Sequence, residues 1–245
     1  MPRQFSPYGS SRRVLLLGAA SLIMGVATFG GGKARAEEPL KIGIIGTGKI
    51  GGALARHWVK AGHEVFVSSR HPEALRDLVK ELGPKAHAGT PREAAAFGSV
   101  VLVSVPYGAM PQIGTDFAKE LAGKVIIDTS NPSERRDGTQ AAEWQRKGAG
   151  VSTAELLKNT RVVRAYNCIP AASLANQANR QPARIAIPIG GDDAAAIAVG
   201  ERLVRDSGFD PVVVGSLAKT REFDLGQPLA AGNLSAAELR ARMAK

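Results

Sequence analysis

Residues 40–52 read Leu40-Lys41-Ile42-Gly43-Ile44-Ile45-Gly46-Thr47-Gly48-Lys49-Ile50-Gly51-Gly52. A short apolar strand here leads into the pattern G-x-G-x-x-G, and that pattern opens an expected helix over residues 49–61. Gly46 permits the tight turn, Gly48 lets the backbone approach a pyrophosphate, and Gly51 lets the helix pack closely on its strand. The N-terminal amides of the helix would face the phosphates. The stretch therefore predicts a dinucleotide-binding turn over residues 46–51.

A second apolar strand is expected over residues 64–69, and its end carries no acidic residue. NAD-binding turns place Asp or Glu there to bind the ribose 2′-hydroxyl. This chain has Ser69 and Arg70 instead, and a hydroxyl beside a guanidinium suits a 2′-phosphate through charge-assisted hydrogen bonds. Thr47 adds another hydroxyl from the glycine turn. These residues predict NADP; the alternative is a polar strand end before a helix that begins at Pro72.

Apolar runs of four to seven residues alternate with stretches of helical periodicity along the rest of the chain. This alternation, with continuous apolar strands such as residues 99–105, is typical of a parallel sheet covered on both faces. We predict an α/β, doubly wound Rossmann-type fold with a mostly parallel sheet, in a single domain with a small C-terminal extension. Strands are expected at 40–46, 64–69, 99–105, 124–128, 161–166, 184–189 and 210–214, and helices near 49–61, 72–82, 91–97, 110–122, 138–147, 170–178, 192–207 and 234–243.

Three parts of the chain are distinguished by their patterns. Residues 1–36 are predicted to be a signal peptide, residues 37–215 the nucleotide-binding Rossmann domain, and residues 216–245 a C-terminal helical tail. The segment 131–150 is expected to be a long surface excursion, because it is rich in turn-forming and charged residues.

The first 36 residues have the three parts of an export signal. A basic start precedes an apolar run over residues 14–29, which is short for a membrane-spanning helix, and Ala34-Arg35-Ala36 supplies a small-x-small cleavage pattern. Arg12 and Arg13 followed by apolar residues resemble a twin-arginine signal. We therefore expect a twin-arginine-type signal and a periplasmic location; the alternative is an uncleaved anchor, which would be the only link to a membrane.

Composition limits the classes of partner. The net charge is +10, and five of the basic residues and no acidic ones lie in residues 1–36, so the rest of the chain carries +5. Aromatic residues are only 5% of the chain and no basic block contains them, which argues against nucleic acid. The single cysteine, Cys168, forms no internal disulfide, and no His or Cys cluster has the spacing of metal ligands.

Candidate ligand-binding residues follow the expected strands, because open parallel sheets bind ligands at the carboxyl ends of their strands. Asn131 and Asn167 can bind a nicotinamide carboxamide or a substrate, or can serve in capping a turn or helix. Cys168 has no nearby cation after it to activate a thiolate and is expected to be a buried apolar residue. There is no Tyr-x-x-x-Lys pair. No catalytic residue is therefore assigned, and an acceptor that takes a hydride without a positioned protein acid would explain that absence.

Several further motifs occur in order over residues 40–215. They are Gly62-His63-Glu64-Val65, Leu102-Val103-Ser104-Val105-Pro106, Val125-Ile126-Ile127-Asp128, Val163-Arg164-Ala165-Tyr166-Asn167 and Gly190-Gly191-Asp192-Asp193. With the glycine turn, they resemble the NADP-dependent reductases of the deazaflavin coenzyme factor 420. That family shares its nucleotide domain with pyrroline-5-carboxylate reductases and with the reductase domain of the metalloreductases called six-transmembrane epithelial antigens.

The resemblance implies where a cofactor would lie. It implies NADP held by residues Thr47, Gly48, Lys49 and Ile50, with Thr47, Ser69 and Arg70 around the 2′-phosphate. It also implies that Val105, Tyr107 and Ala165 lie near the rest of the cofactor, with the partner coenzyme near residues 167–170.

Together these observations predict an NADP(H)-dependent oxidoreductase. It would transfer a hydride between the nicotinamide and a small-molecule electron acceptor, namely a deazaflavin, a flavin-like molecule or a metal chelate. The alternative is an NADP-binding redox sensor or partner-binding module without turnover. The sequence leaves a homodimer open.

Overall fold

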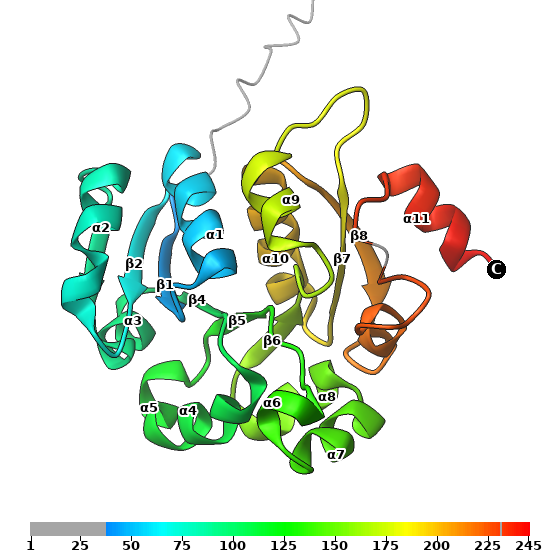
Figure 1. The fold of residues 1–245 in the computed structure, drawn as a ribbon, viewed down its shortest axis with the longest axis horizontal. Helices are drawn as coiled ribbons and strands as arrows, with labels where there is room; N and C mark the ends of the chain where they lie inside the picture. Colours follow the sequence, from blue (N-terminus) through cyan, green and yellow to red (C-terminus); the bar gives the residue numbers. More distant parts are fainter. Residues whose placement is uncertain (1–37, 231) are drawn as a thin grey trace, which may run out of the picture. The chain divides into compact units, whose positions relative to one another are not determined.

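The computed structural model describes residues 38–230 and 232–245 (Figure 1). The predicted signal peptide lies outside these residues. Within them, eight strands form one sheet in the order β3-β2-β1-β4-β5-β6-β7-β8. Neighbouring strands are parallel except β6 and β7, which are antiparallel. The strands are β1 Lys41–Ile45, β2 Glu64–Ser68, β3 Ala86–Gly89, β4 Val100–Val103, β5 Val125–Asp128, β6 Arg161–Arg164, β7 Ala186–Gly191 and β8 Asp210–Gly215.

Helices cover both faces of the sheet because both faces are apolar. Along β4, Val100 and Leu102 belong to the core on one face, and Val101 and Val103 to the core on the other. The first face is covered by α1 Lys49–Lys60, the short η1 turn Pro72–Leu75, α2 Arg76–Leu82, α9 Ala171–Asn176 and α10 Ala194–Asp206. The second face is covered by α3 Pro91–Phe97, the η2 turn Tyr107–Ala109, α4 Met110–Asp116, α5 Ala118–Leu121, α7 Gln140–Lys147 and α8 Ala149–Leu156, with α6 Glu134–Asp137 preceding α7.

The C-terminal segment packs on the last two strands. The η3 turn Lys219–Phe223 and helix α11 Ala236–Met243 bury Phe223 and Leu239 against Ala186 of β7 and Val212 of β8. Figure 1 shows α11, in red, beside β8 at the sheet's end. In residues 38–230 and 232–245 no helix combines the length and apolarity needed to span a membrane.

The doubly wound, mostly parallel sheet predicted from the sequence is confirmed. The elements that were not predicted are strand β3, whose residues Ala86-His87-Ala88-Gly89 are too weakly apolar to stand out, helices α6 and α8, and the short η2 and η3 turns. The expectation that residues 131–150 form a surface excursion is correct only for the first half of the segment, where α6 buries no residue. The expected helix near 138–147 is present as α7, and it buries Ala141 and Trp144 in the core of the second face.

A buried histidine ties three elements together. His63 follows α1 and is 2% exposed. Its Nδ1 accepts a hydrogen bond from the Leu40 backbone N–H at 3.0 Å, and its Nε2 lies 2.9 Å from the Asp206 carboxylate at the end of α10. Both hydrogen bonds can form when the ring is neutral and carries its proton on Nε2. Burial lowers the pKa of His63. The hydrogen bond and the charge of Asp206 act in the opposite direction, and the charges of Arg202 and Lys85 lower the pKa slightly further.

We predict that this histidine makes stability depend on pH. Because the pKa of His63 is lower in the folded chain, the unfolded chain binds the extra proton first as the pH falls below about 6.5. The free energy of unfolding should therefore decrease on acidification, with a slope of at most about 1.4 kcal/mol per pH unit from this group. Urea unfolding at several pH values should show a smaller slope for His63→Gln than for the wild type. The exposed His71 provides the control: His71→Gln should keep the wild-type slope, and equal slopes for wild type and His63→Gln would contradict the assignment.

Candidate nucleotide and acceptor site

The three glycines of the turn between β1 and α1 have different surroundings. Gly46 has φ +96°, and a Cβ built on it would lie 2.3 Å from the carbonyl oxygen of Ser104. A Cβ on Gly51 would lie 2.2 Å from the carbonyl oxygen of Gly46. A Cβ on Gly48 would meet no atom within 4 Å. Gly46 and Gly51 are therefore required by the fold, whereas Gly48 borders open space in which a phosphate can approach the backbone.

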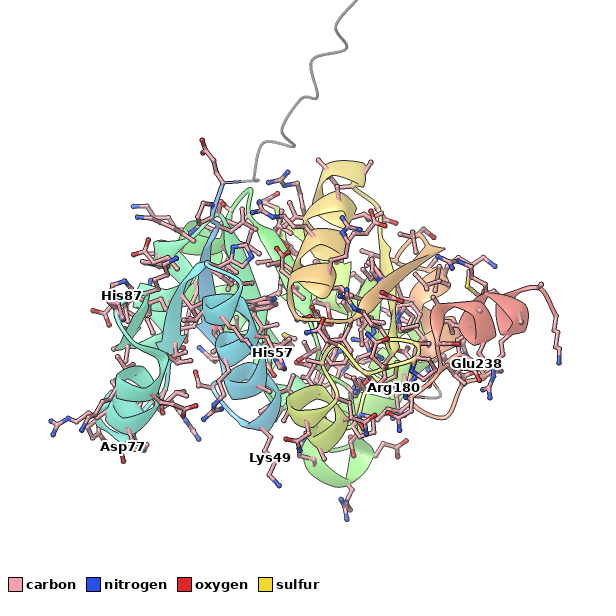
Figure 2. The ribbon with its side chains drawn as sticks, turned by 90° about the horizontal axis from the view of Figure 1, so that it is seen from above. Lys49, His57, Asp77, His87, Arg180 and Glu238 are labelled. Atoms are coloured by element: carbon pink, nitrogen blue, oxygen red, sulfur yellow. The ribbon has the colours of Figure 1, made fainter. Side chains whose placement is uncertain are left out.

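The N-terminus of α1 is free to bind an anion. Gly48 is its N-cap and supplies no side-chain hydrogen bond, and the first turn contains no acidic residue. The first backbone N–H groups of a helix have no acceptor within the helix, and its dipole favours negative charge there. Lys49 is exposed in this turn, and Figure 2 shows its side chain extending away from the ribbon.

At the end of β2, some polar side chains form hydrogen bonds within the protein and one has no partner. The Thr47 hydroxyl donates to the Ser68 carbonyl at 2.9 Å and accepts from the Ser68 N–H at 3.1 Å, so its only proton is used to fasten the glycine turn to β2. Ser69 Oγ accepts from the N–H of His71. Arg70 is exposed and has no hydrogen-bond or ion-pair partner among the described residues. Arg70 is therefore the free cation at this strand end, and Thr47 positions the turn rather than offering a donor.

Val105 and Tyr107, which are predicted to lie near the cofactor, follow the end of β4. The N–H of Val105 donates to Ser130 Oγ at 3.3 Å, which joins the ends of β4 and β5. The Tyr107 ring is fully buried and packs against Trp144, and its hydroxyl donates to the Ala149 carbonyl at 2.8 Å. The side chain of Tyr107 therefore belongs to the core, because an aromatic ring in η2 faces the apolar layer beneath it. Any contact of this residue with a cofactor would come from its main chain.

A buried arginine organises the ends of β5 and β6. Arg164 is opposite Asp128 in the strand register, and both side chains are fully buried. Arg164 Nη1 donates to Asp128 Oδ2 at 2.9 Å and to the Ser130 carbonyl at 2.7 Å. Its Nε and Nη2 both donate to Asp224 Oδ1, and Nη2 also donates to Asn131 Oδ1 at 2.8 Å. All five N–H donors of the guanidinium are thus used within the protein.

The carboxylates around Arg164 have further donors. Burial raises the pKa of Asp128, while the Arg164 charge, the Ser130 N–H and the Thr153 hydroxyl oppose that change. Asp224 Oδ2 accepts from the Ala149 N–H at 3.1 Å, which connects the tail to the start of α8. A buried charge without such partners would be strongly destabilising. The sequence prediction did not include this network. Arg164 lies inside the apolar run Val162-Val163-Arg164-Ala165, and a charged residue in a buried strand indicates that it has charged or polar partners.

The two asparagines expected at this edge lie together. Asn131 Nδ2 donates to the Asn167 carbonyl at 2.8 Å, and Asn167 Nδ2 donates to the Phe223 carbonyl at 2.9 Å. Neither asparagine is the N-cap of the helix that follows it, because Ser133 precedes α6 and Pro170 precedes α9. Their amides instead connect β5, β6 and the tail. The Asn167 Oδ1 atom is buried and has no hydrogen-bond partner.

The residues after β6 offer no activated nucleophile or acid. Ala165 is buried and its N–H donates to the Asp128 carbonyl. Tyr166 is buried with φ +60°, its hydroxyl bonds Ser207 Oγ at 2.9 Å, and burial raises its pKa. Burial also raises the pKa of Cys168 to about 11, so its thiol is protonated at neutral pH. Within the described part of the chain, no three His, Cys, Asp or Glu side chains are grouped to hold a metal ion.

Space for a ligand lies beside the glycine turn. A cavity of about 480 Å³ lies between α1 and α9 and includes Lys49, Arg56 and His57 on one side and Ala171 and Ala172 on the other. His57 Nε2 is 2.8 Å from the Leu174 carbonyl and links the two helices, which Figure 2 shows side by side. The cavity therefore begins at the helix terminus that would bind the pyrophosphate and extends along the groove between α1 and α9.

Comparison with known proteins agrees with this geometry. Residues 41–132 match the family model described as NADP oxidoreductase, coenzyme F420-dependent. The metalloreductase STEAP3 of Rattus norvegicus is 31% identical over 191 residues, which cover 77% of this chain and 36% of that protein. The F420-dependent NADP reductase of Methanothermobacter thermautotrophicus is 30% identical over 148 residues, which cover 55% of this chain and 64% of that protein. The chain thus spans about a third of the first relative and slightly less than two thirds of the second.

Solved structures share the fold over most of the chain. A hypothetical protein, SMa0349, from Sinorhizobium meliloti aligns with a TM-score of 0.70 and 27% identity, over 81% of this chain and 96% of that one. A putative F420-dependent NADP reductase from Arthrobacter sp. FB24 aligns with a TM-score of 0.65 and 24% identity, over 74% of this chain and 87% of that one. Residues 41–132 are thus similar to the coenzyme F420-dependent NADP oxidoreductases, and the fold of most of the chain is shared with solved structures.

Proposed function

We propose that this protein binds NADP(H) at the turn between β1 and α1 and transfers a hydride between the nicotinamide and a small electron acceptor. The observation that carries the proposal is the pairing of open space at Gly48 with the unpaired cation of Arg70. Open backbone and an uncapped helix terminus suit the pyrophosphate, and the exposed guanidinium suits the 2′-phosphate. The family match and the two reductase relatives support the same cofactor.

The residues of the chain supply binding and orientation in this proposal. NADPH, when bound, would supply the hydride, and the reduced acceptor would take its proton from water. Water is proposed as the proton source because Tyr107, Tyr166 and Cys168 are buried in the protein, and their burial also raises the pKa of each group. An acceptor whose ring system stabilises the added electrons meets this requirement. We therefore propose a deazaflavin or a flavin-like molecule, which takes up both the hydride and the proton, as the acceptor. A metal chelate would instead be reduced by single electrons, two chelates for each NADPH, with release of a proton.

A non-catalytic NADP-binding sensor is the competing proposal. The saturated hydrogen bonding of Arg164 and the burial of Tyr166 and Cys168 directly after β6 favour it. The two proposals differ in turnover. NADPH oxidation followed at 340 nm with flavins and ferric chelates present separates them, because a sensor would bind NADPH without consuming it.

We predict that the protein prefers NADPH to NADH by about tenfold or more. A charge-assisted hydrogen bond contributes about 1.5–3 kcal/mol, and about 1.4 kcal/mol is tenfold in affinity. Fluorescence titration of the wild type with both cofactors gives the ratio. Arg70→Ala should remove most of the preference while leaving NADH affinity unchanged. Arg240→Ala, on the exposed face of α11, is the control and should retain the preference. Equal affinities in the wild type would refute the assignment of Arg70.

We predict opposite outcomes for two glycines of the turn. Gly48→Val should melt within a few degrees of the wild type, since its side chain would enter open space, and it should lose NADPH binding. Gly51→Ala should lower the melting temperature markedly, because its Cβ would overlap the Gly46 carbonyl oxygen at 2.2 Å. Thermal melts and NADPH titration of both variants measure this. A Gly48→Val variant that still binds NADPH would place the cofactor elsewhere.

We also propose that residues 1–36 direct the folded protein through the twin-arginine route to the periplasm. The route suits a nucleotide-binding domain because the protein would cross with its cofactor already bound. Changing Arg12 and Arg13 to lysine should retain the precursor in the cytoplasm, as measured by cell fractionation and N-terminal sequencing. A mature protein that still begins at Glu37 outside the inner membrane would instead indicate a general secretory route.

A further inference from the structure

A second cavity opens at the edge of the sheet that carries the ends of β5 and β6. Its volume is about 440 Å³, and it lies between α7 and the segment that follows η3. The polar residues that line it are Asn131, Gln145, Arg146, Arg221, Asp224 and Gln227. Asn131 follows Ser130, whose hydroxyl accepts from Val105. The cavity therefore begins at the strand ends where the nicotinamide half of a cofactor is expected.

Two arginines of this cavity form no ion pair, although the charge of Arg146 contributes to lowering the pKa of Glu143 one turn earlier in α7. Arg146 at the end of α7 and Arg221 in η3 are both exposed, and neither forms a hydrogen bond or an ion pair with another described residue. The stem of Arg221 lies along Gly148, since a Cβ on that glycine would be 3.5 Å from Arg221 Cβ. Gly148 lies between α7 and α8, two residues after Arg146 in the chain. The contact with Gly148 therefore places the stem of Arg221 near the end of α7 that carries Arg146. The neighbouring Lys147 is paired with Glu143 and Glu155.

The one carboxylate in the cavity does not neutralise these arginines. Asp224 accepts hydrogen bonds from Arg164 and from the Ala149 N–H. Asp128 and Asp224 carry two negative charges and Arg164 carries one positive charge, so this network has a net charge of −1. Arg146 and Arg221 carry two positive charges, which leaves a net charge of +1. The amide of Gln227 adds hydrogen-bond donors to the lining, whereas Gln145 Nε2 already donates one hydrogen bond to the Pro132 carbonyl. A concave surface with surplus positive charge and free guanidinium groups is suited to a phosphate or carboxylate.

We propose that this cavity binds an oxyanionic group of the electron acceptor, with Arg146 and Arg221 as its ligands. The inference rests on the proposed function and narrows it, because it requires the acceptor to be a ring system that carries a phosphate or carboxylate. Arg146 and Arg221 are specificity residues in this account. They hold the acceptor by its charged end and take no part in the transfer of the hydride.

The test compares FMN with riboflavin, which have the same ring system and differ by one phosphate. Quenching of flavin fluorescence measures both affinities directly and requires no turnover. The titrations are made with saturating NADP⁺ so that the glycine turn is not available to the FMN phosphate. We expect FMN to bind at least about tenfold more tightly than riboflavin. In the double variant Arg146→Gln/Arg221→Gln the two affinities should agree within about twofold, and riboflavin affinity should not change.

The control is Arg240→Gln on α11, which removes one positive charge away from this cavity and should keep the preference for FMN. Equal binding of FMN and riboflavin by the wild type would overturn the proposal, and so would a preference that survives in the double variant. NADPH titration of the same proteins tests the cofactor site separately. A preference that depends on the two arginines in a protein that binds no NADPH would support the anion site and reject the proposed function.

Discussion

The buried guanidinium of Arg164 holds together the part of the molecule in which chemistry is proposed. Its five N–H donors are divided among Asp128 at the end of β5, the carbonyl of Ser130, the amide of Asn131 and the carboxylate of Asp224 in the tail. A buried charge is tolerated only where such partners are complete. The position of the tail is therefore linked to the ends of two central strands. Loss of any partner would leave charge buried without compensation.

This constraint divides the site into two halves with different properties. The half formed by β1, α1 and β2 has free donors, namely the uncapped start of α1 and the unpaired Arg70. The half formed by β5, β6 and the tail has already used its buried donors internally, and Gly232 of the tail approaches the Cys168 carbonyl so closely that a Cβ there would lie 2.3 Å from it. Free charge in this second half lies further out, on Arg146 and Arg221. A rigid platform with charged groups at its rim suits binding and orientation of two small molecules rather than acid–base catalysis.

The sequence predicted those features that a local physical requirement imposes. The glycine turn was predictable because Gly46 needs a positive φ and Gly51 needs a close approach to backbone, and no other residue type meets both needs. β3 was not predictable from Ala86-His87-Ala88-Gly89, because an edge strand needs little apolar area. The role of Asp224 was not predictable either, since its partner Arg164 is 60 residues away in the chain. Tyr107 shows a further limit: a motif fixes the course of the main chain, while packing against Trp144 decides where the ring lies.

The central claim is that NADP(H) lies across the glycine turn and the end of β2. The most direct measurement is the change in backbone amide NMR shifts when NADP⁺ is added to the isotope-labelled protein. The account predicts the largest changes at residues 46–51 and 69–71, with smaller ones at residues 105–107 and 130–131. Changes confined to other surfaces, or no change at saturating NADP⁺, would contradict it.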